Sequence, residues 1–251
     1  MRPGCPRVNR VARRTGAESG FSRFGPPRAA RALAGEADRV FRPVLAQLRA
    51  RGWRAIPLSL ASAALIAIFA LLQHSDPGWW LVEHVAAVYQ ALPIWLIILR
   101  LPLSMFAPAP DLPAWGAIAQ VLVVFAVAEV QLGRWRTLLV AVCTNALTTL
   151  SARLMWIVSA VLGVGTPQID AYELDTGPST VVVALSVYVL LRCRAYILLA
   201  AIVLAMALET VLLPNLAGRE HLVAVGLGAA SFLIGDRLPV ALRDRRARRA
   251  L

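Results

Sequence analysis

GPSTVVVALSVYVLL, residues 177–191, is one of six long apolar runs that decide the fold of this chain. A helix that crosses the hydrocarbon core of a bilayer needs about 20 consecutive apolar residues. With 59% of its 251 residues hydrophobic, the chain is too apolar to be a soluble domain. The pattern therefore predicts an all-α, polytopic membrane protein with six spans, at residues 55–73, 112–130, 137–158, 177–191, 195–213 and 221–238.

The formal net charge of +12 comes from arginine, which supplies all 26 basic residues. Thirteen arginines lie in residues 1–54 and six in residues 237–251, so they flank the apolar part of the chain. Flanking arginine retains loops in the cytoplasm and attracts anionic lipid headgroups. We therefore expect anionic lipids as partners of both arginine-rich ends, and no nucleic acid partner.

The arginines between the runs set the orientation of the six spans. If both ends of the chain lie in the cytoplasm, Arg134 and Arg192 fall in inner loops, and the loop 166–176, which has no basic residue, falls outside. A seventh apolar segment, 81–99, would reverse every later loop if it crossed the membrane. We therefore interpret it as an interfacial or re-entrant segment that packs against protein.

These patterns divide the chain into three parts. Residues 1–54 are expected to form an arginine-rich cytoplasmic tail that is partly disordered, and residues 239–251 a second arginine-rich cytoplasmic tail. Residues 55–238 form the six-span membrane domain, with the interfacial segment at 79–110. The predicted location is the cell membrane, with both termini in the cytoplasm.

Ser179 and His221 begin two of the apolar runs, and the charge pattern puts both near the outer face. A hydroxyl in the first turn of a helix lies beside free backbone N–H groups, where negative charge is stabilised. An imidazole can take the serine proton and later return it. The plainer alternatives are a serine that caps its helix and a histidine solvated at the interface. Small residues after His221, at Ala224, Gly226 and Gly228, would let the two helices approach closely.

Four short motifs occur in an informative order. LPLSMF stands at 101–106, EVQLGRWR at 129–136 and GPST at 177–180, and His221 is followed by Gly228. Together they resemble the rhomboid family, the six-span class of intramembrane serine proteases. The first motif resembles the stretch before the second rhomboid span, and the second resembles the junction of spans two and three. The last two resemble the Gly-x-Ser-Gly motif and the sixth-span histidine, and the similarity covers about residues 55–238.

The resemblance implies a function and a set of site residues. Ser179 would be the nucleophile and His221 the base, in a dyad without an aspartate, and Gly177 would give backbone support at the oxyanion. The protein would cleave transmembrane substrates near the outer face without a cofactor. The three cysteines do not have the spacing of metal ligands, so no metal site is expected.

The chain also departs from the rhomboid pattern. Rhomboids usually carry a His and, four residues later, an Asn in the outer part of the second span, where this chain has Pro113 and Ala117. Another frequent His falls near Pro108, and Thr180 replaces the second glycine of the serine motif. Neither proline nor alanine can donate a side-chain hydrogen bond to an oxyanion. The loss of one such donor typically lowers the rate about 10²–10³-fold.

Two other functions therefore stay open. The first is a catalytically inactive rhomboid-like scaffold that binds client membrane proteins. The second is a small transporter component, which would need polar residues that converge at the bilayer midplane.

Four further polar residues have alternative interpretations. His84 and Gln90 are candidates to replace the missing oxyanion donors, or are ordinary interfacial residues. Glu209, near the outer end of its run, is either functional or solvated at the interface. Glu129 is expected to be structural, bound to a nearby arginine or to a backbone at the inner face.

Overall fold

The computed structural model describes residues 28–110, 112–162, 172, 174–213 and 215–237. The predictions for residues 1–27 and for the tail at 239–251 lie outside these residues. Within the described part the chain is helical and has no strand, so the all-α prediction is confirmed. The elements are α1 (Arg28–Arg51), η1 (Gly52–Ala55), α2 (Pro57–Leu72), α3 (Asp76–Val85), α4 (Ile94–Ser104), α5 (Ala114–Leu132), α6 (Arg134–Leu162), α7 (Ser179–Arg192), α8 (Tyr196–Leu212), α9 (Leu216–Phe232) and η2 (Leu233–Arg237).

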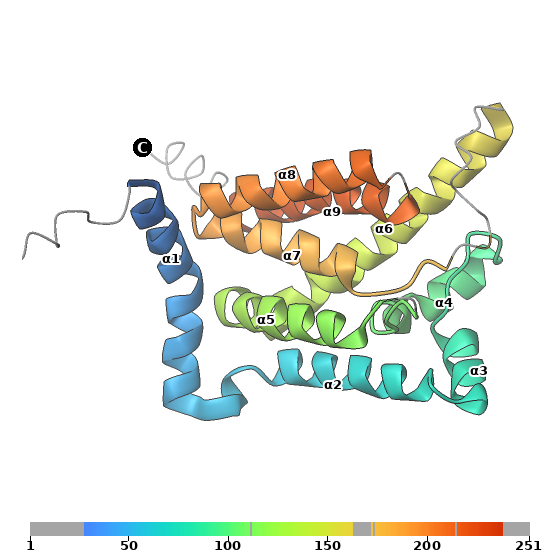
Figure 1. Ribbon diagram of the computed structural model, residues 1–251, viewed down its shortest axis with the longest axis horizontal. Helices are drawn as coiled ribbons and strands as arrows, with labels where there is room; N and C mark the ends of the chain where they lie inside the picture. Colours follow the sequence, from blue (N-terminus) through green and yellow to red (C-terminus); the bar gives the residue numbers. More distant parts are fainter. Residues whose placement is uncertain (1–27, 111, 163–171, 173, 214, 238–251) are drawn as a thin grey trace, which may run out of the picture.

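The helices form a bundle with two distinct ends (Figure 1). Helices α2, α5, α7, α8 and α9 run side by side, and α6 crosses them obliquely. Helix α1 lies across one end, which we call the α1 end, and α3 and α4 lie at the other, which we call the α3–α4 end. Helix α7 is the centre of the bundle, because it contacts α5, α6, α8 and α9.

Helices α7 and α9 pack closely because the residues between them are small. Ala184 of α7 and Ala224 of α9 are completely buried. A Cβ added to Gly228 would lie only 2.4 Å from the carbonyl oxygen of Ala184, so only glycine fits there. Gly226 faces open space and does not contribute to this contact. The close approach expected for the runs 177–191 and 221–238 is therefore present.

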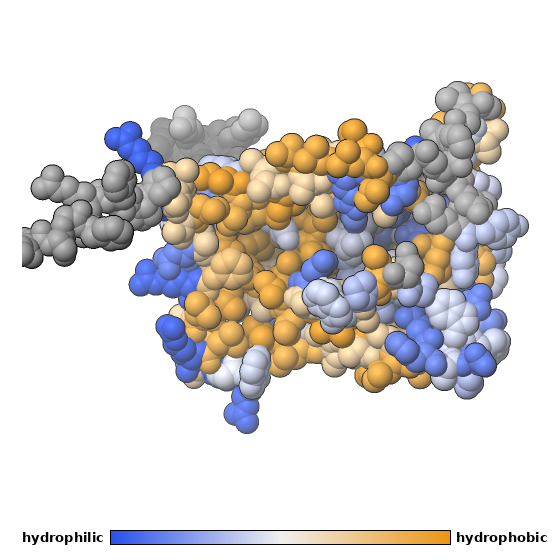
Figure 2. Space-filling view, viewed as in Figure 1, coloured by the Kyte–Doolittle hydropathy of each residue, from blue (hydrophilic) through white to orange (hydrophobic). Residues whose placement is uncertain are grey.

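Two helices, α5 and α6, are long and apolar enough to cross a membrane, and α1 with α2, bent by 61°, makes a third candidate by length and composition among the described residues. Helices α4, α7 and α8 are apolar but shorter. Apolar residues cover most of the middle of the face seen in Figure 2, and polar residues gather toward the α1 end and around α3. This distribution is typical of a protein that associates with a membrane.

The run 81–99 is not a single helix. Helix α3 ends at Val85 and α4 begins at Ile94, with non-helical chain between them. Arg100 holds this break together, because its guanidinium donates to the carbonyls of Glu83 (3.1 Å) and Ala87 (2.8 Å). The segment therefore folds back on itself at the α3–α4 end.

The same segment is bound to α6 and to the chain before α7. The guanidinium of Arg153 in α6 donates to the carbonyls of Gln90 (2.7 Å) and Leu92 (2.6 Å). The Gln90 side chain, which is completely buried, donates to the Asp175 carboxylate at 3.0 Å. The chain between α3 and α4 and the chain before α7 are thus joined beside the start of α7.

At the α1 end, Glu129 of α5 binds the start of α2. Its carboxylate accepts hydrogen bonds from the backbone N–H groups of Leu58 (3.2 Å) and Ser59 (3.1 Å) and lies 4.0 Å from Arg134. These N–H groups belong to the first helical turn and have no acceptor within the helix. The structural role expected for Glu129 is confirmed.

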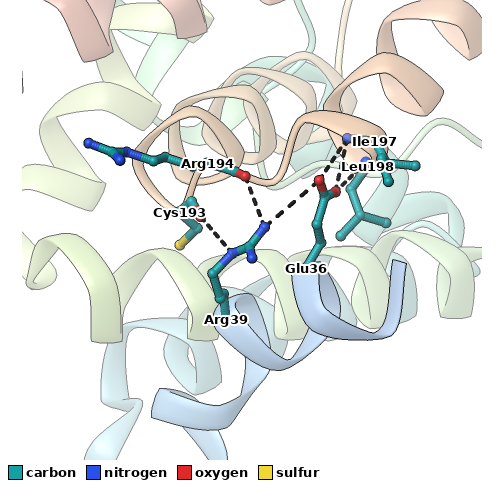
Figure 3. A network of polar contacts seen from close by, with 6 residues as sticks. All are labelled: Glu36, Arg39, Cys193, Arg194, Ile197 and Leu198. Atoms are coloured by element: carbon teal, nitrogen blue, oxygen red, sulfur yellow. Dashed lines mark hydrogen bonds and ion pairs between the residues drawn. The ribbon is translucent and has the colours of Figure 1, made fainter. Parts of the chain in front are cut away.

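The Glu36 carboxylate binds the start of α8, as the Glu129 carboxylate binds the start of α2. Figure 3 shows the contacts of Glu36. From α1, its carboxylate accepts hydrogen bonds from the N–H groups of Ile197 (2.9 Å) and Leu198 (3.0 Å) in the first turn of α8. Burial alone would raise the pKa of Glu36, but these hydrogen bonds and the charge of Arg39 hold that pKa below its ordinary value. The carboxylate therefore stays ionised and holds α1 against α8.

Arginines also gather at the α1 end. Arg39 donates to the carbonyls of Cys193 (3.2 Å) and Arg194 (3.0 Å) in the turn between α7 and α8. Asp236 accepts from Arg136 and Arg192. The arginines expected in two separate inner loops therefore lie at one end of the bundle.

Candidate active site

A cavity of about 540 Å³ opens near the α3–α4 end, between α5, α7, α8 and α9. Both Ser179 and His221, the two residues singled out in the sequence, line it. The cavity wall is mostly apolar, and its polar side chains come from Gln120, Thr176, Ser179, Ser186, Glu209 and His221. An apolar cavity with a few convergent polar groups is the usual form of a binding or catalytic site.

Ser179 is the first residue of α7 and does not cap it. The N-cap is Pro178, which makes no side-chain capping hydrogen bond. The simple capping role considered for Ser179 is therefore wrong. The backbone N–H groups at the start of α7 have no acceptor within the helix, so they lie beside the hydroxyl as potential anion donors.

Gly177 shapes the approach to α7 through its backbone. Its φ of +120° is a conformation that side chains rarely allow, so glycine is required there. Its N–H donates to the carbonyl of Ser104 at 3.0 Å. Gly177 therefore positions Ser179, but its own amide is already used and is not available to an oxyanion.

His221 lies in the second turn of α9, not at its start. The helix begins at Leu216, because the Asn215 side chain caps it by accepting from the N–H of Gly218 at 2.9 Å. The residue is 7% exposed, so the interface-solvated histidine considered from the sequence is wrong. The apolar run 221–238 misses this first turn because it contains Arg219 and Glu220.

Glu209 is the partner of His221. Its Oε2 lies 2.8 Å from Nδ1 of the imidazole, and both side chains line the cavity. The other ring nitrogen, Nε2, is buried and has no hydrogen bond partner among the described residues. The sequence left Glu209 between a functional and a solvated role, and the hydrogen bond to His221 favours the functional one.

Ser179 and His221 share the cavity but do not touch through a hydrogen bond. Within the described residues, Nδ1 of His221 binds Glu209 and Nε2 binds nothing, so the serine hydroxyl is not attached to the ring. Catalytic hydrogen bonds are often long before substrate binds and shorten in the substrate complex. The arrangement provides a hydroxyl, a buried free nitrogen and a carboxylate around one cavity.

Thr176 also belongs to the cavity, although no sequence motif marks it. It lines the cavity three residues before Ser179, and its Oγ1 is buried without a hydrogen bond partner among the described residues. A buried hydroxyl without a partner costs free energy, about 1–3 kcal/mol, unless a ligand completes it. Nothing in the local sequence distinguishes this threonine from an ordinary loop residue.

Two positions at which the sequence departs from the rhomboid pattern also lie on the cavity. Both Pro113 and Ala117 line its wall. His84 and Gln90, the candidates to replace the missing oxyanion donors, do not line the cavity. His84 binds the carbonyl of Trp80 (2.7 Å) and stacks on the Trp80 ring, and Gln90 binds Asp175. His84 and Gln90 therefore do not supply the missing donors.

The described residues contain no group of three or more His, Cys, Asp or Glu side chains that could hold a metal ion. A scan against protein-family models, a search of curated proteins and a search of solved structures found no match to this chain. The short motifs and the geometry around Ser179 and His221 are therefore the features that point to a function.

Proposed function

We propose that the protein is a rhomboid-like intramembrane serine protease that cleaves transmembrane substrates near their outer ends. The observation that carries this proposal is the shared cavity of about 540 Å³, which Ser179 reaches from α7 and His221 from α9. These residues are 42 positions apart in the chain and meet at one end of the bundle through the α7–α9 contact. A serine hydroxyl with a nearby imidazole is the minimal set for acyl transfer.

The proposal includes six membrane spans, formed by α2, α5, α6, α7, α8 and α9, with both termini in the cytoplasm. The arginines at the α1 end support this orientation, because arginine concentrates in cytoplasmic loops. Helix α7 has only 14 residues, but its central position means that neighbouring helices, not lipid, surround it. Anionic lipids would bind the arginine-rich termini.

The reaction would proceed in two acyl-transfer steps. Ser179 Oγ forms a bond to the substrate carbonyl carbon while its proton passes to Nε2 of His221. The tetrahedral intermediate then loses the amine, which takes the proton from Nε2 as the C–N bond breaks. Water repeats the sequence on the acyl-enzyme, giving its proton to Nε2 and releasing the carboxylic acid and the free hydroxyl.

The oxyanion in this reaction would be held by groups other than those of typical rhomboids. The buried hydroxyl of Thr176 and the N–H groups at the start of α7 are donors close to Ser179 in the chain that would serve this purpose. They would take the place of the side chains that Pro113 and Ala117 do not provide.

A second hollow favours a substrate that is embedded in the membrane. An apolar groove of about 410 Å³ runs between α1, α5, α7 and α8, and it shares Ser186 and Ile202 with the cavity. An apolar helix in this groove would lead directly to the polar side chains. The substrate class favoured is therefore another membrane protein.

A fluorophosphonate probe tests the proposal in the purified full-length protein. We expect covalent labelling at Ser179, and its loss in Ser179→Ala and in His221→Ala, because either change removes a reacting group. Ser151→Ala is the control, since Ser151 lies on α6 and lines neither the cavity nor the groove, and it should leave labelling unchanged. Labelling that persists in Ser179→Ala would remove the assignment.

A non-catalytic scaffold for client membrane proteins is the second candidate. The observation that favours it is the presence of Pro113 and Ala117 on the cavity wall, without the usual donors. The double variant Pro113→His with Ala117→Asn separates the two functions. If neither the natural chain nor this variant is labelled or cleaves a membrane substrate, the scaffold is the better account.

A further inference from the structure

We propose that Glu209 is a positioning residue for His221, so that the site is a Ser–His–Glu triad and not a dyad. This inference depends on the proposed function of the same site. It assigns to α8 a role that neither the sequence motifs nor the expected dyad include.

The geometry of the imidazole carries the inference. Glu209 Oε2 lies 2.8 Å from Nδ1 of His221. A carboxylate only accepts hydrogen bonds, so it selects the form of the ring that has its proton on Nδ1. In that form Nε2 has a free lone pair, and this nitrogen is the one that is buried without a partner among the described residues. The pair thus leaves the ring ready to take a proton from Ser179.

The connection between α8 and α9 holds this pair in place. The Thr210 hydroxyl, next to Glu209, donates to the carbonyl of Gly218 at 2.8 Å. A Cβ added to Gly218 would lie 3.1 Å from Cα of Thr210, so the two helices are in close contact there. Glu209 and His221 therefore face each other where α8 and α9 are in close contact.

The environment of the pair is suited to catalysis. The His221 side chain is 10% exposed and the Glu209 side chain 27%, so the imidazole is more deeply buried than the carboxylate. When the ring takes the serine proton it becomes a buried cation, which is costly without a neighbouring negative charge. Glu209 supplies that charge at the nitrogen away from the reaction, as the carboxylate does in serine hydrolase triads.

Glu209→Gln is the sharpest test, because it keeps the shape and removes the charge. An amide can donate to Nδ1 and so select the ring form with its proton on Nε2, which cannot accept the serine proton. We expect fluorophosphonate labelling of Ser179 to slow about 10³–10⁴-fold, while the melting temperature stays close to that of the natural chain. Glu83→Gln makes the same chemical change away from the cavity and should keep the full labelling rate.

Two more variants separate positioning from simple structural support. Glu209→Asp keeps the charge and should retain part of the labelling rate. Glu209→Ala should be slow, and added formate should restore part of its rate, because Glu209 lines the cavity and its place becomes open to a small carboxylate. Formate should not restore His221→Ala, which lacks the ring itself.

The outcomes distinguish this inference from the proposed function. Absence of Ser179 labelling in the natural chain would overturn the proposed function and the triad with it. Normal labelling of both the natural chain and Glu209→Gln would leave the Ser–His dyad and overturn the triad. Slow labelling of Glu209→Ala with a lowered melting temperature and no response to formate would make the contact structural only, which also overturns the inference.

Discussion

Carboxylates accept hydrogen bonds at both ends of the bundle, but from different kinds of group. At the α1 end, Glu36 and Glu129 bind backbone N–H groups at the starts of α8 and α2. Toward the α3–α4 end, Glu209 binds the side chain of His221, whose second nitrogen has no partner among the described residues. The first arrangement is complete without a ligand, and the second is not.

The difference separates polar groups that stabilise the fold from polar groups that are left available to bind a ligand or to react. A buried polar atom without a partner typically costs about 1–3 kcal/mol, so its presence needs an explanation. Nε2 of His221 and Oγ1 of Thr176 are two such atoms on one cavity. We therefore expect substitutions at the cavity to change labelling and substitutions at the α1 end to change stability.

After Ser179, His221 and Glu209, the largest effect on labelling is expected at Thr176. Thr176→Val removes the hydroxyl and keeps the shape, so labelling of Ser179 should slow about 10²-fold as one oxyanion donor is lost. The melting temperature should not fall, because that hydroxyl makes no hydrogen bond within the described residues. Rates of fluorophosphonate labelling and thermal unfolding measure the two quantities.

Thr144→Val is the control for this prediction. The Thr144 hydroxyl is also buried without a partner in the described part of the chain, but it lies on α6 away from the cavity. Equal slowing in both threonine variants would contradict the role given to Thr176.

An intermediate effect is expected where α7 and α9 meet. Gly228→Ala would force a Cβ toward the Ala184 carbonyl, and such overpacking costs about 1–3 kcal/mol of stability. Because the contact also brings Ser179 and His221 to one cavity, labelling should slow as well. Gly226→Ala is the matched control, since Gly226 faces open space, and it should not lower the melting temperature. Equal melting temperatures for both variants would show that the contact is looser than described.

The smallest effect is expected for the pH dependence of the α1 end. The pKa of Glu36 lies below its ordinary value of 4.5, so its contribution to stability is complete above that value. The contribution should disappear as the pH falls through the lowered pKa and the carboxylate takes up a proton. The difference in melting temperature between the natural chain and Glu36→Gln, followed from neutral to acid pH, measures it.

Asp38→Asn is the control for the pH experiment. Asp38 lies 3.6 Å from Arg42 with both side chains largely exposed, and such surface pairs contribute little. Glu36→Gln should leave labelling of Ser179 unchanged. A loss of labelling in that variant would break the division between the two ends.

Much of the helical framework could be predicted from apolar periodicity. The runs 112–130 and 195–213 differ by only a few residues from α5 and α8. The run 221–238 begins too late, because the first turn of α9 contains charged residues that an apolar pattern excludes. Its start depends on the cap made by Asn215, a local hydrogen bond that hydropathy does not report.

The site could be predicted only in part. Ser179 and His221 could be singled out because each begins an apolar run and the chain has only three histidines, and both line the cavity. Glu209 and Thr176 were not assigned, since neither belongs to a sequence motif. The hydrogen bond of Glu209 to His221 and the buried hydroxyl of Thr176 are features of the folded chain alone. In the sequence, only the small residues that follow His221, such as Ala224 and Gly228, indicated the close contact between α7 and α9.

By itself, the sequence determined the helical class of this protein and the concentration of charge at the ends of its chain, because both follow from composition and local periodicity. Only the tertiary structure decided which carboxylates bind backbone N–H groups and which one binds an imidazole. Whether such a hydrogen bond forms depends on differences of a few tenths of an ångström in the distances between groups on neighbouring helices. Those distances are set by packing, such as glycine against a carbonyl at Gly228, and not by any single segment.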